Sequence, residues 1–418
     1  MTQDISPVDN LTGQSRRVAP TFDAAVVGGG PAGLAAALAL VTAAPRLRVA
    51  MIGPRVVTPG AADTRTMALF GPSLALLGRL GILPALDAQC ATITGIRLID
   101  DTGGLLRAPE TLFRAHEIGL DRFGLNVPNG LLVDLLEAAI AGNPAITRID
   151  SAPVAHVTAH ADHVALTLAD GETVSAGLAV AADGRASITR EAAGITVKTW
   201  DYEQTAIVAR LAHRRPHAGI SSEVHRPHGP CTIVPLPGDL SSLVWMERPA
   251  VARRLLALDD ASFRAALEAA LHGLAGGIGT LSPRRAIPLT GMKPDHFSAR
   301  RIALVGEAAH VFPPIGAQGL NLGLRDAASL ADMVAEYGGS DAGCDAVMQA
   351  YDRDRQLDVG SRTLGVDLLG RSLTSTNPLA GIARGLGLQL AHAIPALRRT
   401  MIGAGMAPLG KLPSLMRP

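Results

Sequence analysis

Short apolar runs alternate along the chain with longer stretches of helical composition. Phe22–Val27 is an apolar run of strand length, Leu34–Thr42 is rich in alanine and leucine, and Leu47–Ile52 is a second apolar run. Strand, helix and strand in this order predict a βαβ unit. The uncharged stretch that starts at Ala24 is long enough for a membrane span, but its GGGPAG cluster would break such a helix. We therefore expect the fold to begin here, after a loose N-terminal arm at 1–20.

The rest of the chain continues the alternation. Leucines at helical spacing predict a helix over Gly130–Ala141, and Ser262 is the expected N-cap of a helix over Ser262–Leu274. Asp170-Gly171 is a hairpin signal. The other expected helices are Asn321–Tyr337 and Cys344–Leu369, and the other expected strands are Ile93–Ile99, Val154–Leu168, Thr173–Ala182, Thr205–Ala209, Cys231–Val234, Ser242–Met246 and Arg301–Val305.

The length of 418 residues predicts more than one domain, because single hydrophobic cores stop growing at roughly 250–300 residues. The pattern predicts an α/β protein with a Rossmann-type domain, three-layered around a mostly parallel sheet. A strand-rich α+β domain is inserted into it, and a helical tail follows. We assign the Rossmann-type domain to 21–90, 125–195 and 290–370, the inserted domain to 91–124 and 196–289, and the tail to 371–418.

Composition narrows the function. A hydrophobic content of 48% is ample for a large core, while the net charge of +1 and an aromatic content of 3% argue against a nucleic-acid partner. The three cysteines, Cys90, Cys231 and Cys344, are scattered and form no CxxC pair. This spacing predicts neither a disulfide framework nor a metal site, and it fits a cytoplasmic protein with buried, inert thiols.

The first chemical motif is Gly28-x-Gly30-x-x-Gly33, between the first expected strand and helix. The three glycines permit a tight turn, close approach of a pyrophosphate, and packing of the helix on the strand. An acidic residue for the adenosine ribose should follow about 20 residues later, but Gly53 stands there. Either another group binds the ribose, with Asp63 a candidate, or the adenosine is held more weakly.

Two further motifs follow expected strands. One is Asp183-Gly184-x-x-Ser187-x-x-Arg190 after LAVAA, and the other is GEAAH at 306–310, which runs on into PPIGAQGLNLG. A loop rich in proline and glycine that enters a helix presents backbone N–H groups, which suit an anionic or electron-rich ring edge. Each motif alone is compatible with an ordinary loop. Together, in this order, they indicate a dinucleotide site.

The three motifs together resemble the single-component aromatic hydroxylases, the para-hydroxybenzoate hydroxylase superfamily. PPIGAQGLNLGLRD and DTRTMAL, which contains Arg65, are most similar to its ubiquinone-biosynthesis branch. The resemblance, from about residue 22 to the tail, implies an FAD-binding domain and a flavin hydroperoxide that hydroxylates an activated ring. It implies a polyprenylated aromatic substrate, O₂ and NAD(P)H or another electron donor. No second GxGxxG occurs, and in this family the DG motif also serves the pyridine nucleotide.

The resemblance also assigns roles to residues. The family usually has Asp at the position of Glu307, where it contacts the ribityl chain, and the longer Glu is expected to keep this role. The residues expected beside the reacting ring are Pro314, Gly316 and Gln318, and Asn321 is expected to help orient it. The cofactor-binding residues that it implies are Gly28, Gly30, Ala32, Gly33, Arg65, Asp183, Gly184, Ser187, Gly306, Glu307, Gly319, Leu320 and Asn321.

Histidines leave an alternative open. His310 is either a catalytic base or a structural histidine whose hydrogen bonds are satisfied at a helix start. His225 and His228 lie in the expected inserted domain and are interpreted as structural, and we expect no metal set.

The C-terminal tail has a charge of its own. After Asp367 no acidic residue occurs, whereas six of the 38 basic residues do, so the rest of the chain is net negative. The tail is interpreted either as an amphipathic helix on an anionic membrane surface or a partner complex, or as a helix packed on the body. The apolar stripe consists of Leu379, Ile382, Leu386, Leu390, Ile394 and Leu397.

Three functions are compatible with these motifs. The first is an FAD-dependent monooxygenase that hydroxylates a polyprenylated phenol or quinol of ubiquinone biosynthesis, peripheral on the inner face of the cell membrane. The second is a flavin-dependent reductase or dehydrogenase of an isoprenoid substrate. The third is a non-catalytic flavin-binding subunit of a quinone-biosynthesis complex.

Overall fold

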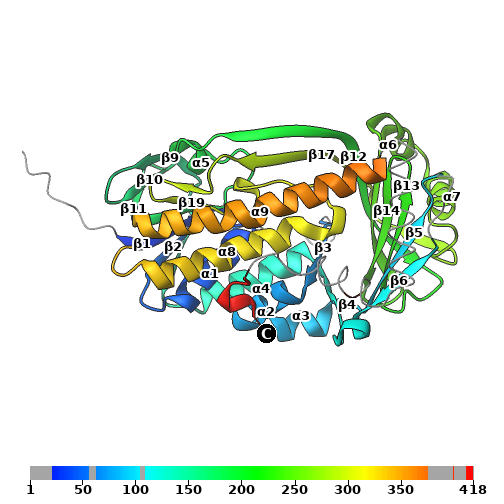
Figure 1. Ribbon diagram of the computed structural model, residues 1–418, viewed down its shortest axis with the longest axis horizontal. Helices are drawn as coiled ribbons and strands as arrows, with labels where there is room; N and C mark the ends of the chain where they lie inside the picture. The colour runs from blue at the N-terminus through cyan, green and yellow to red at the C-terminus, as the bar shows by residue number, and fades with distance from the viewer. Residues whose placement is uncertain (1–20, 56–62, 104–108, 375–398, 400–410, 418) are drawn as a thin grey trace, which may run out of the picture.

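Figure 1 shows the computed structural model, which describes residues 21–55, 63–103, 109–374, 399 and 411–417. The predicted βαβ unit is confirmed as β1 (Phe22–Val27), α1 (Pro31–Ala43) and β2 (Val49–Ile52). Every residue of β2 and the last four of β1 are buried. Continuous burial of this kind is typical of parallel strands that are covered on both faces.

The first sheet has eight strands. Besides β1 and β2 it contains β8 (Ile146–Ile149), β9 (Val154–Ala159), β10 (Val164–Leu168), β11 (Thr173–Ala181), β18 (Ser298–Ala299) and β19 (Ile302–Leu304). Its order is β18-β19-β11-β1-β2-β8, and β10 and β9 continue from β11. The central pairs, from β19 to β8, are parallel, whereas β9, β10 and β11 pair antiparallel. Segments far apart in sequence thus share one sheet, as expected for a Rossmann-type domain assembled from separate pieces.

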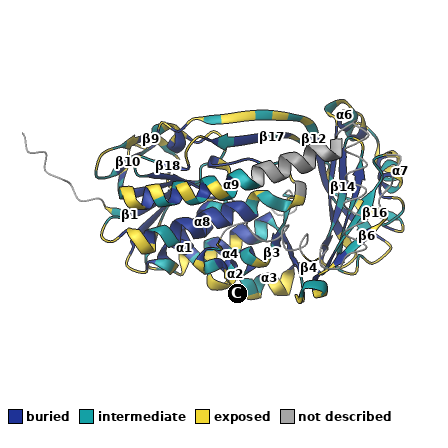
Figure 2. Ribbon diagram, in the orientation of Figure 1, coloured by how far each residue is buried: buried dark blue, intermediate teal, exposed yellow. Residues whose placement is uncertain are grey.

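Long helices lie beside this sheet: α1, α4 (Asn129–Ala141), α8 (Gln318–Tyr337) and α9 (Asp345–Thr374) (Figure 1). α8 packs against both α1 and α9. The close approach of α8 requires small residues, because a Cβ at Gly323 would lie 3.3 Å from Cβ of Ala32 and 3.1 Å from Cα of Gly306. Buried residues extend along α8 and the neighbouring strands in Figure 2.

The second large sheet also has eight strands and carries the inserted part of the chain. Its order is β16-β12-β15-β14-β13-β5-β6, with β17 paired to β12. In Figure 1 the long strands β12 and β17 run from the first sheet to the second. Their bounds are β5 (Gly95–Asp100), β6 (Thr111–Arg114), β12 (Val197–His213), β13 (Ile220–Arg226), β14 (Gly229–Leu236), β15 (Leu240–Glu247), β16 (Ile278–Leu281) and β17 (Arg285–Pro294).

A third, three-stranded sheet lies between these two parts. It consists of β3 (Thr66–Phe70), β7 (Gly124–Pro128) and β4 (Ala91–Ile93). The remaining helices are α2 (Gly71–Arg79), α3 (Leu83–Gln89), α5 (Ile188–Ala192), α6 (Pro249–Leu256) and α7 (Asp260–Ala270). α6 and α7 share a hydrophobic core with the second sheet, in which the Trp245 and Phe263 ring centroids lie 6.0 Å apart.

Three local predictions were wrong. The expected strand Ile93–Ile99 is broken at Thr94, and its two parts, β4 and β5, belong to different sheets. The expected strand Val154–Leu168 is divided into β9 and β10, which pair antiparallel with each other. The N-cap of α7 is Asp259, whose carboxylate accepts a hydrogen bond from the backbone nitrogen of Ser262 at 2.7 Å. Since Asp and Ser are both good N-caps, composition alone did not separate them.

The predicted tail lies largely outside the described residues, including the whole of its apolar stripe. The last described segment, 411–417, is held against the body: Ser414 donates its backbone N–H to Asp332 Oδ2 at 2.7 Å, and Met416 is buried. In the part of the chain that the structure describes, we find no helix of the length and apolarity that crossing a membrane requires. Cys90 and Cys231 are buried as predicted, and Cys344 is partly buried.

Candidate active site

The first glycine motif forms a tight junction between β1, β11 and α1. Gly28 has φ +119°, and a Cβ there would lie 2.2 Å from the carbonyl oxygen of Ala182. A Cβ at Gly33 would lie 2.2 Å from the carbonyl oxygen of Gly28. Gly30 differs, because no atom lies within 4 Å of a Cβ built there, directly before the first turn of α1. The motif therefore brings backbone close to backbone and leaves open space at a helix N-terminus, where an anion is stabilised.

The end of β2 lacks the carboxylate of a typical Rossmann fold. Gly53 has φ +128°, a conformation that favours glycine, and its carbonyl oxygen accepts a hydrogen bond from Arg148 Nη1 at 2.6 Å. A cavity of about 470 Å³ opens beside it, and Asp183 is the only acidic residue among its described lining residues. Asp63 does not line this cavity, and its carboxylate is paired with Arg65 and Asn129. The Arg65 hydrogen bond holds the pKa of Asp63 well below its usual range.

The second motif is held together by its own side chains. Asp183 accepts hydrogen bonds from the Ser187 hydroxyl and from Thr189, whose Oγ1 lies at 3.0 Å. The Ser187 oxygen caps α5 by accepting the backbone N–H of Arg190 at 2.9 Å. Gly184 has φ +84° and open space where its Cβ would be. Asp183 and Ser187 thus fix the loop, and Gly184 leaves room for a ligand beside it.

The third motif is fixed by a buried carboxylate on α8. Asp326 Oδ2 accepts hydrogen bonds from the backbone nitrogen of Gly306 at 3.0 Å and from His310 Nε2 at 2.7 Å. Arg355 on α9 donates its Nε–H to Asp326 Oδ1 at 2.9 Å. Burial opposes ionisation of Asp326, but His310, Arg355 and the Gly306 hydrogen bond outweigh it and lower the pKa of this carboxyl. The turn from Gly306 to His310 is therefore held at both ends by one charged group.

Charged side chains of the second and third motifs and of the DTRTMAL segment line one cavity. Glu307 pairs with Arg185, with Oε2–Nε 3.2 Å and Oε1–Nη2 3.3 Å. Both side chains are about half exposed. Arg65 has a raised pKa because of its hydrogen bond to Asp63 and, to a smaller extent, the charge of Glu307. Two cations and a carboxylate thus lie close to the glycine-rich backbone, which suits a phosphate-bearing ligand with hydroxyl groups.

Asn321 has a structural role that its motif did not reveal. Its Oδ1 accepts hydrogen bonds from Phe70 N and Ser73 Oγ, and its Nδ2 donates to Ala68 O and Ala317 O. These four bonds use the full capacity of an amide side chain. Asn321 therefore ties the start of α8 to β3 and α2, and any contact with a ligand has to come from its backbone.

One cavity of about 470 Å³ joins the motifs to the second sheet. Val208 on β12, Leu243 on β15 and Leu289 on β17 line its apolar wall together with the hydroxyl-bearing Ser242 and Thr290. Among the described residues of the second sheet that line this cavity, none is charged. The predicted site residues that it brings together are Gly30, Ala32, Gly33, Arg65, Gly184, Gly306, Glu307, Pro314, Gly319 and Leu320.

Other predicted residues lie apart from this cavity. Gly28 and Asp183 line the neighbouring cavity beside Gly53, to which Gly30 and Gly184 also contribute. Ser187, Gly316, Gln318 and Asn321 line neither cavity. Sequence reasoning missed Thr64, Asn129, Arg185, Thr290 and Phe312 in the lining. Arg185 lies within the DG motif, Thr64 within DTRTMAL and Phe312 within the third motif, so the positions of these three were marked although the residues were not singled out.

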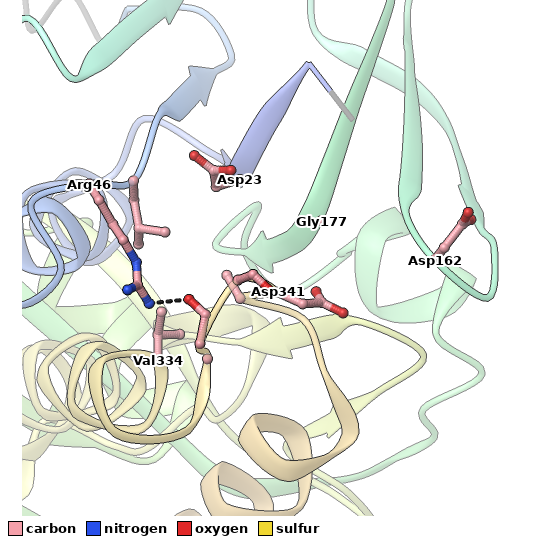
Figure 3. Close-up of a pocket in the computed structure, with 11 residues that line it drawn as sticks. Asp23, Arg46, Asp162, Gly177, Val334 and Asp341 are labelled. Atoms are coloured by element: carbon pink, nitrogen blue, oxygen red, sulfur yellow. Dashed lines mark hydrogen bonds between the residues drawn. The ribbon is translucent and has the colours of Figure 1, made fainter. Parts of the chain in front are cut away.

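A further hollow of about 240 Å³ lies at the opposite edge of the first sheet (Figure 3). Asp23, at the start of β1, lines it, together with Arg46, which donates to the carbonyl oxygen of Gly339. Asp341 lines it as well and forms a two-point ion pair with Arg301 at 2.7 and 2.8 Å. Ligands of open α/β sheets bind at the carboxyl ends of the strands, so this hollow lies at the wrong edge for a dinucleotide.

Comparison with known proteins identifies the family. A family model described as an FAD binding domain matches residues 21–363. A ubiquinone hydroxylase, UbiL of Rhodospirillum rubrum, is 35% identical over 416 residues, which cover 97% of this chain and 94% of that protein. The chain belongs to the FAD-dependent aromatic hydroxylases, in the ubiquinone-biosynthesis branch.

Other relatives support the same placement of this hydroxylase. The 3-demethoxyubiquinol 3-hydroxylase of Escherichia coli is 31% identical over 386 residues, covering 90% of this chain and 96% of that protein. Among solved structures, the p-nitrophenol 4-monooxygenase PnpA of Pseudomonas putida has the same fold, with a TM-score of 0.75 and 18% identity over 93% of this chain and 99% of that one. The hydroxylase is thus an FAD-dependent monooxygenase, as the motifs predicted.

The residues of the hydroxylase fit FAD. At Gly30, Gly184 and Gly319 no atom lies within 4 Å of a built Cβ, so the backbone of all three motifs is open to a ligand. The helix N-terminus of α1 and the nearby Arg65 suit the pyrophosphate, and the Glu307 carboxylate suits hydroxyl groups. These features fit an FAD site, and the carboxylate that usually binds the adenosine ribose is absent at Gly53.

Proposed function

We propose that this hydroxylase adds a hydroxyl group to the aromatic ring of a polyprenylated phenol or quinol intermediate of ubiquinone biosynthesis. The observation that carries the proposal is the cavity in which the FAD motifs face an uncharged, apolar wall. Such a wall suits a neutral ring with a hydrocarbon chain, because an unpaired charge buried against apolar side chains is costly. The names of the relatives from Rhodospirillum rubrum and Escherichia coli support the same pathway.

FAD and the protein would contribute different parts of the reaction. Bound FAD supplies the activation of O₂, with electrons from NAD(P)H or another donor. The chain supplies binding, orientation and a dry pocket. We assign FAD binding to Gly28, Gly30, Ala32, Gly33, Arg65, Asp183, Gly184, Ser187, Gly306, Glu307, Gly319, Leu320 and Asn321, with Ser187 and Asn321 acting through the loops that their side chains fix. We assign the wall beside the reacting ring to Pro314, which lines the cavity, and to Gly316 and Gln318, which follow it in the same loop.

The loop after the third motif is shaped to exclude water. Val311 pairs with Met292 through two backbone hydrogen bonds of 3.1 and 3.0 Å, which hold the loop against β17. Phe312 and Pro314 line the cavity on that side. We infer that this apolar loop closes the pocket around the ring and keeps solvent from the oxygenation step.

We also propose that the predicted domain division and the peripheral membrane location hold. The second sheet takes its strands from 95–114 and 197–294, which supports an inserted substrate domain.

A polyprenyl chain is confined to membranes, and six basic residues without an acidic one after Asp367 suit an anionic surface. The membrane would then be the inner face of the cell membrane, reached from the cytoplasm.

Oxygen labelling tests the function. The purified, FAD-loaded enzyme is incubated with a short-chain prenylated phenol and NADPH or a chemical reductant under ¹⁸O₂, and the product is analysed by mass spectrometry. One ¹⁸O atom per product is the expected result. Turnover that continues without oxygen would instead make the protein a reductase or dehydrogenase. No product under any condition, with a strain lacking the protein still blocked in ubiquinone synthesis, would make it a non-catalytic subunit. The quinone intermediate that this strain accumulates would identify the ring position.

A further inference from the structure

The outer face of α6 carries positive charge that has no counter-charge beside it. Ala252 and Leu255 are buried in the hydrophobic core shared with the second sheet, whereas Arg253 and Arg254 lie on the opposite, exposed face of the helix. Arg248, the N-cap residue, is exposed as well. Among the residues that the structure describes, none of these three arginines forms an ion pair with a carboxylate.

The acidic residues next to α6 in sequence are engaged elsewhere. Glu247 is buried at the end of β15, and Asp259 accepts the N-cap hydrogen bond of α7. Asp260 pairs with Arg284 at 3.2 Å. The segment 248–258 itself contains three arginines and no acidic residue. The positive charge of α6 therefore faces solvent.

A fourth exposed arginine lies at the start of β17, a strand that α6 contacts. Arg285 pairs in register with Val208, and directly opposite residues of an antiparallel pair point to the same face of a sheet. Val208 lines the cavity, so Arg285 lies on the cavity face of the second sheet, whereas α6 packs on the other face. We call Arg248, Arg253, Arg254 and Arg285 the α6 patch. These residues flank the start of β17, a strand at the edge of the sheet, from both faces.

An exposed residue of the cavity wall lies at the same edge. Pro288, three residues after Arg285 on β17, is exposed and lines the cavity. Asp201 and Glu203 are exposed on β12, but they precede Thr205, the partner of Pro288, and so lie farther along the strands from Arg285. In Figure 1, α9 runs from the first sheet toward the second, and the basic tail follows α9 in sequence.

We propose that the α6 patch binds the anionic surface of a membrane and presents this edge of the cavity to the bilayer. The inference rests on the proposed function, because a polyprenylated substrate is confined to the bilayer. Each Lys or Arg close to an anionic membrane strengthens binding about fivefold. A guanidinium also binds phosphate oxygens at two points, which suits phospholipid headgroups.

The composition of the outer face favours lipid over a partner protein. Besides the arginines, the exposed residues of this face of α6 are Ala250 and Ala257. The binding energy of protein interfaces is concentrated in a few large side chains, aromatic ones above all, that are buried at the centre of the contact. Charged headgroups need no such pocket-filling residue, so a layer of lipid phosphates fits this face better.

Two pairs of arginines allow a matched comparison. Arg253→Gln with Arg254→Gln removes two charges from the α6 patch, and Arg253→Lys with Arg254→Lys keeps them. Arg214→Gln with Arg215→Gln makes the same change in net charge directly after β12, at the opposite end of that strand from Thr205. Both control arginines are exposed, and neither forms an ion pair among the described residues. FAD content and melting temperature are measured on all proteins.

Sedimentation with vesicles measures the binding. The FAD-loaded proteins, with all 418 residues, are mixed with vesicles of phosphatidylcholine alone or of phosphatidylcholine and phosphatidylglycerol, at low and high salt. We expect the wild type to bind the mixed vesicles, and to do so more weakly at high salt. The Gln pair in α6 should bind them about tenfold or more weakly, whereas the Lys pair and the Arg214, Arg215 control should stay within about twofold of the wild type. Turnover of a prenylated phenol embedded in the mixed vesicles should fall in parallel with binding.

Equal affinity of the wild type and the Gln pair in α6 for mixed vesicles would overturn the role of the α6 patch. An equal loss in the Arg214, Arg215 control would overturn it too, because net charge alone would then explain the binding. Absence of binding to anionic vesicles by every protein would overturn the lipid assignment, even if an acidic protein bound instead. Failure of the proposed function gives a different result: vesicle binding that depends on Arg253 and Arg254, without ¹⁸O in the product of a soluble short-chain phenol.

Discussion

Arg190 of the second motif donates a hydrogen bond from Nη1 to the carbonyl oxygen of Ala308 in the third motif, at 3.0 Å. The two residues are 118 positions apart in sequence. Arg190 also donates from Nη2 to the carbonyl oxygen of Arg185 at 3.0 Å, and it is 4% exposed. One buried guanidinium therefore joins both cofactor motifs, although no ligand contact needs to be assigned to it.

Replacing this guanidinium should loosen both motifs together. In Arg190→Gln the buried carbonyl oxygen of Ala308 and the partly buried one of Arg185 lose charged donors. We expect a loss of about 2–4 kcal/mol of stability and a clear drop in bound FAD. Chemical unfolding and the ratio of flavin to protein absorbance measure the two effects. Arg253→Gln on the exposed surface of α6 is the matched control. A variant with the stability and the FAD content of the wild type would show that the hydrogen bonds of Arg190 are dispensable.

Two glycines of the first motif should respond oppositely to substitution. Gly30→Glu places a charged side chain in open space at the N-terminus of α1, so we expect a folded protein that does not bind FAD, because the carboxylate occupies the pyrophosphate position. Gly28→Ala instead puts a Cβ 2.2 Å from Ala182 O at φ +119°, so we expect poor folding. Circular dichroism and flavin content separate the two results. A yellow Gly30→Glu protein would contradict the assignment of the motif.

Sequence patterns predicted the first sheet well and the cavity wall poorly. The βαβ unit around Gly28 and the strands before the DG and GEAAH motifs follow from local runs of apolar residues that any parallel strand needs. Val208 and Leu289 reach the cavity only because β12 pairs with β17 and β15 in a particular register. Such register is set by contacts between residues far apart in the chain, which no local pattern encodes.

The sequence also did not reveal what the polar residues of the motifs do. Asp183, Ser187 and Asn321 were marked by their motifs as cofactor ligands, yet their side chains are engaged with other protein groups. A motif records which residues a site requires and does not distinguish those that contact a ligand from those that fix a loop. His310 and Asp326 illustrate the reverse case, because their pairing became visible only when α8 was placed beside the turn.

Glu307 should contribute to FAD affinity more than to stability. Its pair with Arg185 is about half exposed, and such pairs are worth about 0–1 kcal/mol. A carboxylate that accepts hydrogen bonds from the ribityl chain is worth more, so we expect Glu307→Ala to weaken FAD binding about tenfold with little change in melting temperature. Arg185→Ala serves as the control for loss of the pair alone. Equal FAD affinity in the wild type and Glu307→Ala would remove this residue from the cofactor site.

Ionisation of Asp326 should make the folding stability depend on pH in the acid range. Its folded pKa is lowered, so its ionisation stabilises the folded state above its unfolded pKa of about 3.9. This contribution is lost as the pH falls through the lower, folded value. We expect Asp326→Asn to cost roughly 3–5 kcal/mol at pH 7, a gap that stays constant down to about pH 5 and narrows below about pH 4. Urea unfolding across this range measures it, and a gap that widens in acid would contradict the predicted direction.

A charge introduced into the uncharged cavity wall should reduce substrate turnover. Val208 lines the cavity from β12 of the second sheet and is buried. In Val208→Asp a carboxylate would face the ring and prenyl chain without a cationic partner, which costs several kcal/mol when the substrate excludes water. We expect FAD content to be retained and turnover of the prenylated phenol to fall by about 100-fold or more. Val208→Thr, nearly equal in volume and uncharged, should keep most of the activity. If both variants lost FAD, the wall would belong to the cofactor site. If Val208→Asp were fully active, the substrate would have to bind elsewhere.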